Sequence, residues 1–289
     1  MKKIFIYIIT AVILLFIVGL NVKLSLEKPK TIHKESIDLS DGTISDLNNN
    51  FLIEKDNEIG VLMVHGLGAS PYQTIDLANF LADKGVTVSS IRLQGHGTNL
   101  KDLEDKKWED WYNDVEIGYN ELKQKTEKTY VLGISLGTSL ILNLAEHHEL
   151  NGMIAIAPPI YLRDKKTIFV PMIRLFKKYH YFGVDQTQIG HAYENLPTGT
   201  ISEFMQLIKI SKKQLSNIKD PILIIQSEKD TLVLPESAKY VYDTISSEQK
   251  ELLFVRSVSH AVIRIYEDDT KESAEERKNI FDRIYKFLK

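Results

Sequence analysis

The sequence predicts an α/β fold, in which a mostly parallel central sheet carries helices on both faces. From about residue 36 onwards, short apolar runs alternate with longer amphipathic ones, which is the pattern of strands and helices in turn. Most of the short runs are continuously apolar, as in strands that are covered on both faces. The 289 residues contain no internal repeat and no long low-complexity segment.

The apolar runs place the individual elements. We expect strands at residues 59–64, 86–91, 129–132, 153–156, 222–225 and 252–255. The clearest helix begins near Lys107, where one apolar stripe is formed by Trp108, Trp111, Tyr112, Val115, Tyr119 and Leu122. We expect the two tryptophans to pack in the core rather than to form a platform for a ligand.

Composition excludes several classes of protein. With 43% hydrophobic and 26% charged residues, the chain is neither disordered nor collagen-like. Its 36 basic and 39 acidic residues give a net charge of -3, which argues against a nucleic-acid binder. The chain has no cysteine, so it has no disulfide framework, thiolate metal site or cysteine nucleophile. It also lacks an H-E-x-x-H pair, so nothing supports a zinc hydrolase.

The N-terminal residues predict a membrane segment. Residues 4–20 carry no charge and follow Lys2 and Lys3, which would stay on the cytoplasmic side. No small-x-small cleavage pattern follows, so we expect an uncleaved anchor, with a cleaved signal and a buried soluble helix as alternatives. The predicted organisation is an anchor or signal at residues 1–22, a polar tether at 23–35 and an extracytoplasmic domain at 36–289.

A candidate nucleophile stands at Ser135. The sequence GISLG at residues 133–137 comes directly after an expected strand and directly before a helix-compatible run. In that context a serine lies on a tight strand-to-helix turn that exposes its hydroxyl, and the glycines permit close approach of neighbouring chains. The alternative is a turn with a capping serine and no catalytic role.

A serine nucleophile needs a base and a carboxylate that orients it. Asp230 and His260 follow the last two expected strands, and therefore lie at the same edge of the sheet as Ser135. Glu228 is a rival for the acid and His96 for the base. The stretch HGLG at residues 65–68 follows the first long strand, so the amides of Leu67 and Leu136 are the candidate oxyanion hole.

Taken together, these residues resemble the α/β-hydrolase superfamily, and within it the small carboxylesterase and monoacylglycerol lipase branch. The resemblance covers residues 51–289 and rests on HGLG (65–68), RLQGHG (92–97), W-x-x-W (108–111), GISLG (133–137), DTLVLPESA (230–238) and SH (259–260). It implies an α/β-hydrolase fold with Ser135 as nucleophile, His260 as base, Asp230 as orienting acid and the Leu67 and Leu136 amides as oxyanion hole. It also implies that His96 belongs to a structural loop.

An insertion at residues 158–215 separates two strands by more than one crossover needs, and we expect a small cap over the site. Its apolar segment at residues 168–176 either lines an acyl pocket or packs on the main domain. The sequence thus predicts a membrane-tethered serine hydrolase that cleaves short to medium acyl esters or monoacylglycerols without a metal or cofactor. A peptidase, thioesterase or carbon-carbon hydrolase with the same residues, or a non-catalytic cell-surface binding protein, are the alternatives.

Overall fold

The computed structural model describes residues 46–173, 175, 177–181, 191–256, 258–260, 262–265 and 269–289. The chain divides into two compact units, Met1–Ile37 and Asp38–Lys289. The predicted anchor and tether belong to the first unit, which lies outside the described residues. Within the described residues, no helix is both long enough and apolar enough to cross a bilayer.

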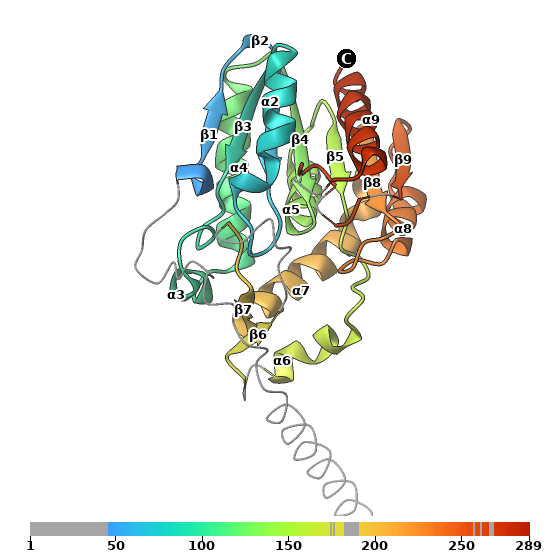
Figure 1. Ribbon diagram of the computed structural model, residues 1–289. Coiled ribbons are helices and arrows are strands. Elements are labelled where there is room, and N and C mark those ends of the chain that lie inside the picture. Colours follow the sequence, from blue (N-terminus) through green and yellow to red (C-terminus); the bar gives the residue numbers. More distant parts are fainter. Residues whose placement is uncertain are drawn as a thin grey trace, which may run out of the picture. The chain divides into compact units, whose positions relative to one another are not determined.

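A seven-stranded sheet forms the centre of the second unit (Figure 1). Its strands run in the order β1-β3-β2-β4-β5-β8-β9, and all neighbours are parallel except β1, which pairs antiparallel with β3. The strands are β1 (Phe51–Ile53), β2 (Asp56–Val64), β3 (Val86–Ile91), β4 (Lys128–Ile134), β5 (Met153–Ile156), β8 (Ile222–Ser227) and β9 (Lys250–Val255). All strands predicted from the sequence are present, so the prediction of a mostly parallel sheet is confirmed.

Helices cover both faces of this sheet, which explains why its strands are continuously apolar (Figure 1). In β2, Leu62 and Val64 pack in a core with residues of α4, α5 and α7, whereas Val61 and Met63 pack in a second core with α2 and α9. The helices are α2 (Ile75–Asp83), α3 (Leu100–Glu104), α4 (Trp108–Lys123), α5 (Leu136–His147), α6 (Val170–Ile173), α7 (Thr198–Gln214), α8 (Glu236–Thr244) and α9 (Lys271–Phe287). Single 3-10 turns lie at Asp46–Asn48, Pro71–Thr74, Lys165–Phe169 and Leu215–Asn217.

The predicted apolar stripe forms one face of α4. Trp111, Val115, Tyr119 and Leu122 are buried, and the Trp111 indole donates a hydrogen bond to the Gln94 carbonyl at 3.1 Å. Trp108 is partly buried against the same core. Both tryptophans are therefore packing residues, as the sequence predicts.

The insertion between β5 and β8 has two halves that pack differently. Its second half, α7, packs on α5 through buried residues that include Phe204 and Leu207, and Ser211 donates a hydrogen bond to the Ser139 carbonyl at 3.0 Å. Its first half contains α6 and a two-stranded antiparallel sheet of β6 (Tyr179–Tyr181) and β7 (Asn195–Pro197). The sequence predicts a cap over residues 158–215, but α7, which lies within this range, belongs to the main core.

The apolar segment at residues 168–176 was expected either to line a pocket or to pack on the main domain. Val170 is buried, but Phe169, Met172 and Leu175 are 51%, 45% and 72% exposed. The prediction that this segment packs on the main domain is therefore wrong for these three side chains. The side chains of Ile168 and Phe176 lie outside the described residues.

Candidate active site

Ser135 lies on the turn that joins β4 to α5. Its backbone has φ 51° and ψ -108°, a conformation that a residue with a side chain adopts only under strain. The two glycines that flank Ser135, Gly133 and Gly137, have no room for a side chain. A Cβ on Gly137 would lie 2.2 Å from the Val64 carbonyl oxygen. A Cβ on Gly133 would meet the backbone of Gly137 at 2.4 Å. The two glycines of the motif are therefore required by the packing of α5 against β2 and β4.

Hydrogen bonds to the neighbouring strand hold this turn in place. The Ser135 amide donates to the Ile156 carbonyl of β5 at 2.9 Å. The Thr138 hydroxyl lies 2.8 Å from the same Ile156 oxygen and 2.7 Å from the Gly133 oxygen. The strained turn at Ser135 is thus bound to the Ile156 carbonyl of β5 through two donors.

Asp230 and His260 are in direct contact. Their side chains meet at 2.7 Å between Asp230 Oδ2 and His260 Nδ1. The other oxygen, Oδ1, accepts from the amides of Leu232 at 2.8 Å and Val233 at 2.9 Å. Asp230 is almost fully buried, so these bonds fix the carboxylate in one orientation toward the imidazole.

Asp230 has a further partner, Gln226, that the sequence analysis did not identify. Its side-chain amide, at the end of β8, donates to Asp230 Oδ2 at 3.1 Å and to the Ser227 carbonyl at 3.1 Å. Gln226 is completely buried. A polar residue at the end of an otherwise apolar strand was the only available signal.

The ionisation of Asp230 follows from these contacts. Burial by itself raises the pKa of the carboxyl. The hydrogen bond and charge of His260, with the amides of Val233 and Leu232, outweigh burial and lower the pKa below its usual value of 3.8. Asp230 is therefore ionised at neutral pH and accepts a hydrogen bond from His260 Nδ1.

The rival residues are placed elsewhere. Glu228 has an exposed carboxylate that pairs with Arg256 at 3.1 Å. His96 is fully buried beside His65 and Trp111, and burial lowers its pKa well below 6.5. Neither residue contacts the Asp230 and His260 pair in the described part of the chain, so the geometry favours Asp230 over Glu228 and His260 over His96.

All three candidate residues follow the carboxyl ends of parallel strands, which meet at one edge of the sheet. Ser135 follows β4, Asp230 follows β8 and His260 follows β9. Within the described residues the Ser135 hydroxyl makes no hydrogen bond, so its pairing with His260 stays a prediction. Catalytic hydrogen bonds of this kind often tighten only when substrate is bound.

The loop after β2 lies against the serine turn. A Cβ on Gly66 would lie 3.7 Å from Ser135 Cβ, so this backbone is in van der Waals range of the serine. The Ala69 amide donates to the Gly66 carbonyl at 3.2 Å, and Gly68 has φ 73°, which gives a tight turn with Leu67 at its corner. The Leu67 amide has no hydrogen-bond partner among the described residues, and its role in an oxyanion hole stays a prediction.

Comparison with known proteins shows the family. The family model described as serine aminopeptidase S33, Hydrolase_4, matches residues 56–191 and 191–268. The chain belongs to this family. The thermostable monoacylglycerol lipase of Bacillus sp. (strain H-257) is 33% identical over 216 residues, which are 72% of this chain and 85% of the lipase. The carboxylesterase of Bacillus subtilis (strain 168) is 23% identical over 239 residues, 81% of this chain and 94% of the esterase.

Solved structures show the same fold. A metagenome-derived lipolytic enzyme from work on LipS and LipT superposes with a TM-score of 0.76 at 23% identity, covering 85% of this chain and 99% of that one. The monoglyceride lipase of Saccharomyces cerevisiae, solved with a substrate analogue, gives a TM-score of 0.70 at 18% identity over 85% of this chain and 95% of its own. This S33-family protein is an α/β-hydrolase of the esterase and monoacylglycerol lipase type.

The hydrolase keeps a neutral histidine, His65, at the start of the loop after β2. His65 Nδ1 donates to the Gly66 carbonyl at 2.9 Å, and its Nε2 accepts from the Leu93 amide at 3.2 Å. Only the neutral ring can make both bonds, because a protonated Nε2 cannot accept. Burial lowers the pKa of His65 from 6.5 to about 4, although the Gly66 carbonyl opposes this, and the Arg92 charge lowers it further.

We expect the free energy of unfolding to fall as pH drops from about 6.5 to 4. The unfolded chain protonates His65 near pH 6.5, whereas the folded protein resists protonation until about pH 4, so the unfolded state binds more protons in this window. The loss from His65 is about 3 kcal/mol, and its contribution is fully present above pH 6.5. Urea unfolding from pH 7 to 4 measures it. His65→Asn should flatten the slope, and equal slopes in both proteins would contradict this account.

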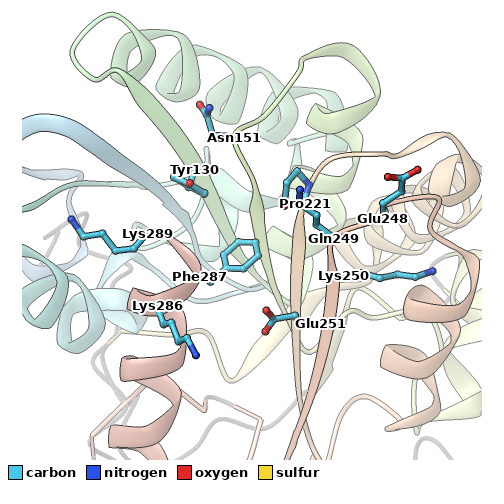
Figure 2. A pocket seen from close by; sticks show the side chains of 10 residues that line it. All are labelled: Tyr130, Asn151, Pro221, Glu248, Gln249, Lys250, Glu251, Lys286, Phe287 and Lys289. Atoms are coloured by element: carbon cyan, nitrogen blue, oxygen red, sulfur yellow. The ribbon is translucent and has the colours of Figure 1, made fainter.

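Two hollows lie at the other edge of the sheet, where the strands begin. One, with a volume of about 520 Å³, is lined by residues that include Tyr130, Asn151 and Phe287 (Figure 2). The second, of about 550 Å³, is lined by residues at and after the end of α5 and by residues that precede β8. Neither includes Ser135, Asp230 or His260, so neither belongs to the candidate active site. No cluster of possible metal ligands occurs among the described residues.

Proposed function

We propose that this hydrolase cleaves carboxylic esters through a covalent acyl-enzyme on Ser135. The observation that carries the proposal is the 2.7 Å contact between Asp230 and His260, at the sheet edge where Ser135 stands on its strained turn. Asp230 fixes the proton on His260 Nδ1, which leaves Nε2 free to accept the proton of the Ser135 hydroxyl.

The reaction proceeds in two steps, acylation of Ser135 and hydrolysis of the acyl-enzyme. Ser135 Oγ bonds to the acyl carbon as His260 takes its proton, and the amides of Leu67 and Leu136 donate to the oxygen that becomes negative. The bond to the alcohol then breaks, and His260 returns the proton to the leaving oxygen. Water attacks the acyl-enzyme by the same route, which releases the acid and restores Ser135. No metal or organic cofactor takes part.

Short to medium acyl esters and monoacylglycerols are the proposed substrates. The 33% identical relative is a monoacylglycerol lipase and the 23% identical relative a carboxylesterase, which supports an ester over a peptide bond. Phe169, Met172 and Leu175 give the first half of the insertion an exposed apolar surface, which suits an apolar acyl chain better than a polar peptide.

A panel of p-nitrophenyl and glyceryl esters of increasing acyl length tests this function. We expect the protein to hydrolyse esters. Each added methylene should lower the activation free energy for kcat/KM by up to about 0.8 kcal/mol, until the site that binds the acyl chain is full. A matched p-nitroanilide measures amide cleavage, and a fluorophosphonate probe reports the reactive serine. Faster cleavage of the amide would assign a peptidase. A folded protein with neither activity nor labelling would favour a binding role.

We also propose that residues 4–20 anchor the protein in the cell membrane, with the catalytic domain on the extracytoplasmic side. The support is the uncharged run behind Lys2 and Lys3. We expect the full-length protein to stay with membranes in carbonate and to be digested by protease added outside intact cells. A soluble form that begins near residues 21–25 would show a cleaved signal instead.

A further inference from the structure

The segment that leads back from the insertion to the main domain, residues 191–197, lies on the loop after β2. The Tyr193 amide donates a hydrogen bond to the Gly68 carbonyl at 2.8 Å. The same segment brings Leu196 onto Gly68, where a Cβ would lie 2.9 Å from Leu196 Cδ2. The insertion therefore reaches the turn that carries the Leu67 amide.

The Tyr193 side chain fixes this segment to a third loop. Its hydroxyl accepts from the Thr98 amide at 2.8 Å and donates to the Gly95 carbonyl at 3.1 Å. These partners follow β3, more than 90 residues earlier in the chain. The hydroxyl also lies 3.4 Å from Thr98 Oγ1. The ring is partly buried, so these hydrogen bonds are partly shielded from water and hold it in one position. Tyr193 thus joins the insertion, the loop after β3 and the loop after β2.

The direction of the Leu67 amide depends on how the turn from Gly66 to Ala69 is held. On the Gly66 side, the turn is fixed by the main domain, since the Gly66 amide donates to Gln73 Oε1 at 2.8 Å. On the other side, the Gly68 carbonyl is held by Tyr193. Glycine at positive φ rotates easily, so the contact with Tyr193 decides the position of this half of the turn.

We propose that Tyr193 is a positioning residue that aims the Leu67 amide at the oxyanion, and so couples the insertion to the chemical step. The proposal rests on the acyl-enzyme function proposed above. Tyr193 does not contact the reacting atoms. It acts through Gly68, and its own position is set by Gly95 and Thr98.

The test compares Tyr193→Phe with Tyr179→Phe. The first removes the hydroxyl that joins residue 193 to Gly95 and Thr98. The second removes a hydroxyl of the same insertion, which donates to Glu104 of α3 and has no contact with the loop after β2 among the described residues. Both delete one oxygen at the boundary between the insertion and the main domain. Only the first should disturb the Leu67 amide.

Two inhibitors separate a misplaced oxyanion hole from a general loss of packing. A trifluoromethyl ketone forms a tetrahedral adduct with an oxyanion, whereas a non-hydrolysable ether analogue of the ester binds without one. For Tyr193→Phe we expect kcat and trifluoromethyl ketone affinity to fall together by roughly 10- to 100-fold, below the ~10²–10³-fold loss for removal of a whole donor. Ether affinity and KM should change less than about twofold. Tyr179→Phe should match the wild type in all of these.

Each outcome decides the proposal. Suppose that the wild type hydrolyses esters and reacts with the fluorophosphonate. If the two variants then behave alike, the role of Tyr193 is overturned, and the proposed function stands. Loss of ether affinity in step with ketone affinity also overturns it, since that indicates a binding or packing role. A wild type with neither hydrolysis nor labelling overturns both. If Tyr193→Phe does not fold, Leu196→Val trims the other side chain on Gly68 and is measured in the same way.

Discussion

Ser135→Ala should abolish ester hydrolysis and fluorophosphonate labelling while leaving the thermal transition nearly unchanged. The substitution removes the attacking oxygen, so turnover should fall on the order of 10⁶-fold, to the level that binding and the oxyanion hole support alone. Stability should hardly change, because the Ser135 hydroxyl makes no hydrogen bond within the described part of the chain. Alanine also has a Cβ, so the strain at φ 51° is the same in both proteins. Ester turnover, probe labelling and calorimetry measure the three effects.

Ser139→Ala is the matched control. Ser139 lies in α5, four residues after Ser135, and both serines are buried, so this variant also loses one buried hydroxyl close to the turn. We expect this variant to keep its turnover and its labelling. Labelling that persists in Ser135→Ala would move the nucleophile to another residue.

The parallel sheet was predictable because its physical cause acts locally. A strand covered on both faces must be apolar along its buried part, and the runs at residues 59–64, 130–134, 153–156 and 222–225 show this directly in the sequence. Ser135, Asp230 and His260 follow β4, β8 and β9, and because these strands are parallel their carboxyl ends lie at one edge of the sheet. The short strands β1, β6 and β7, with three residues each, carry too little pattern to be recognised.

The contacts that complete the site were not predictable, because they join residues far apart in the chain. Tyr193 is one of thirteen tyrosines, and nothing in its neighbourhood shows that its hydroxyl meets Gly95 and Thr98. The helix α7 looked like part of the insertion, since only its contact with α5 shows that it belongs to the main core. Gln226 could be recognised as unusual in an apolar strand, but its partner Asp230 could not.

Asp230→Asn should cost roughly 10⁴-fold in kcat, the size of effect seen where an orienting aspartate is replaced in a serine hydrolase. The amides of Leu232 and Val233 donate to one side-chain oxygen of residue 230, and they would keep the asparagine oxygen on that side. The asparagine NH₂ would then face His260 Nδ1 and donate to it. The imidazole proton would move to Nε2, where it blocks acceptance of the Ser135 proton. Stability should also fall, because the NH₂ would face the Gln226 NH₂ that now donates to Asp230.

Glu228→Gln is the control that separates the two carboxylates of this loop. The Glu228 side chain is 44% exposed and pairs with an Arg256 side chain that is 78% exposed, an ion pair worth at most about 1 kcal/mol. Its loss leaves the 2.7 Å contact between Asp230 and His260 untouched, so we expect turnover within about twofold of the wild type. Steady-state kinetics on one p-nitrophenyl ester, with urea unfolding of each variant, makes the comparison. If Glu228→Gln lost more turnover than Asp230→Asn, the orienting acid would be Glu228, and the His260 loop would have to turn toward solvent to meet it.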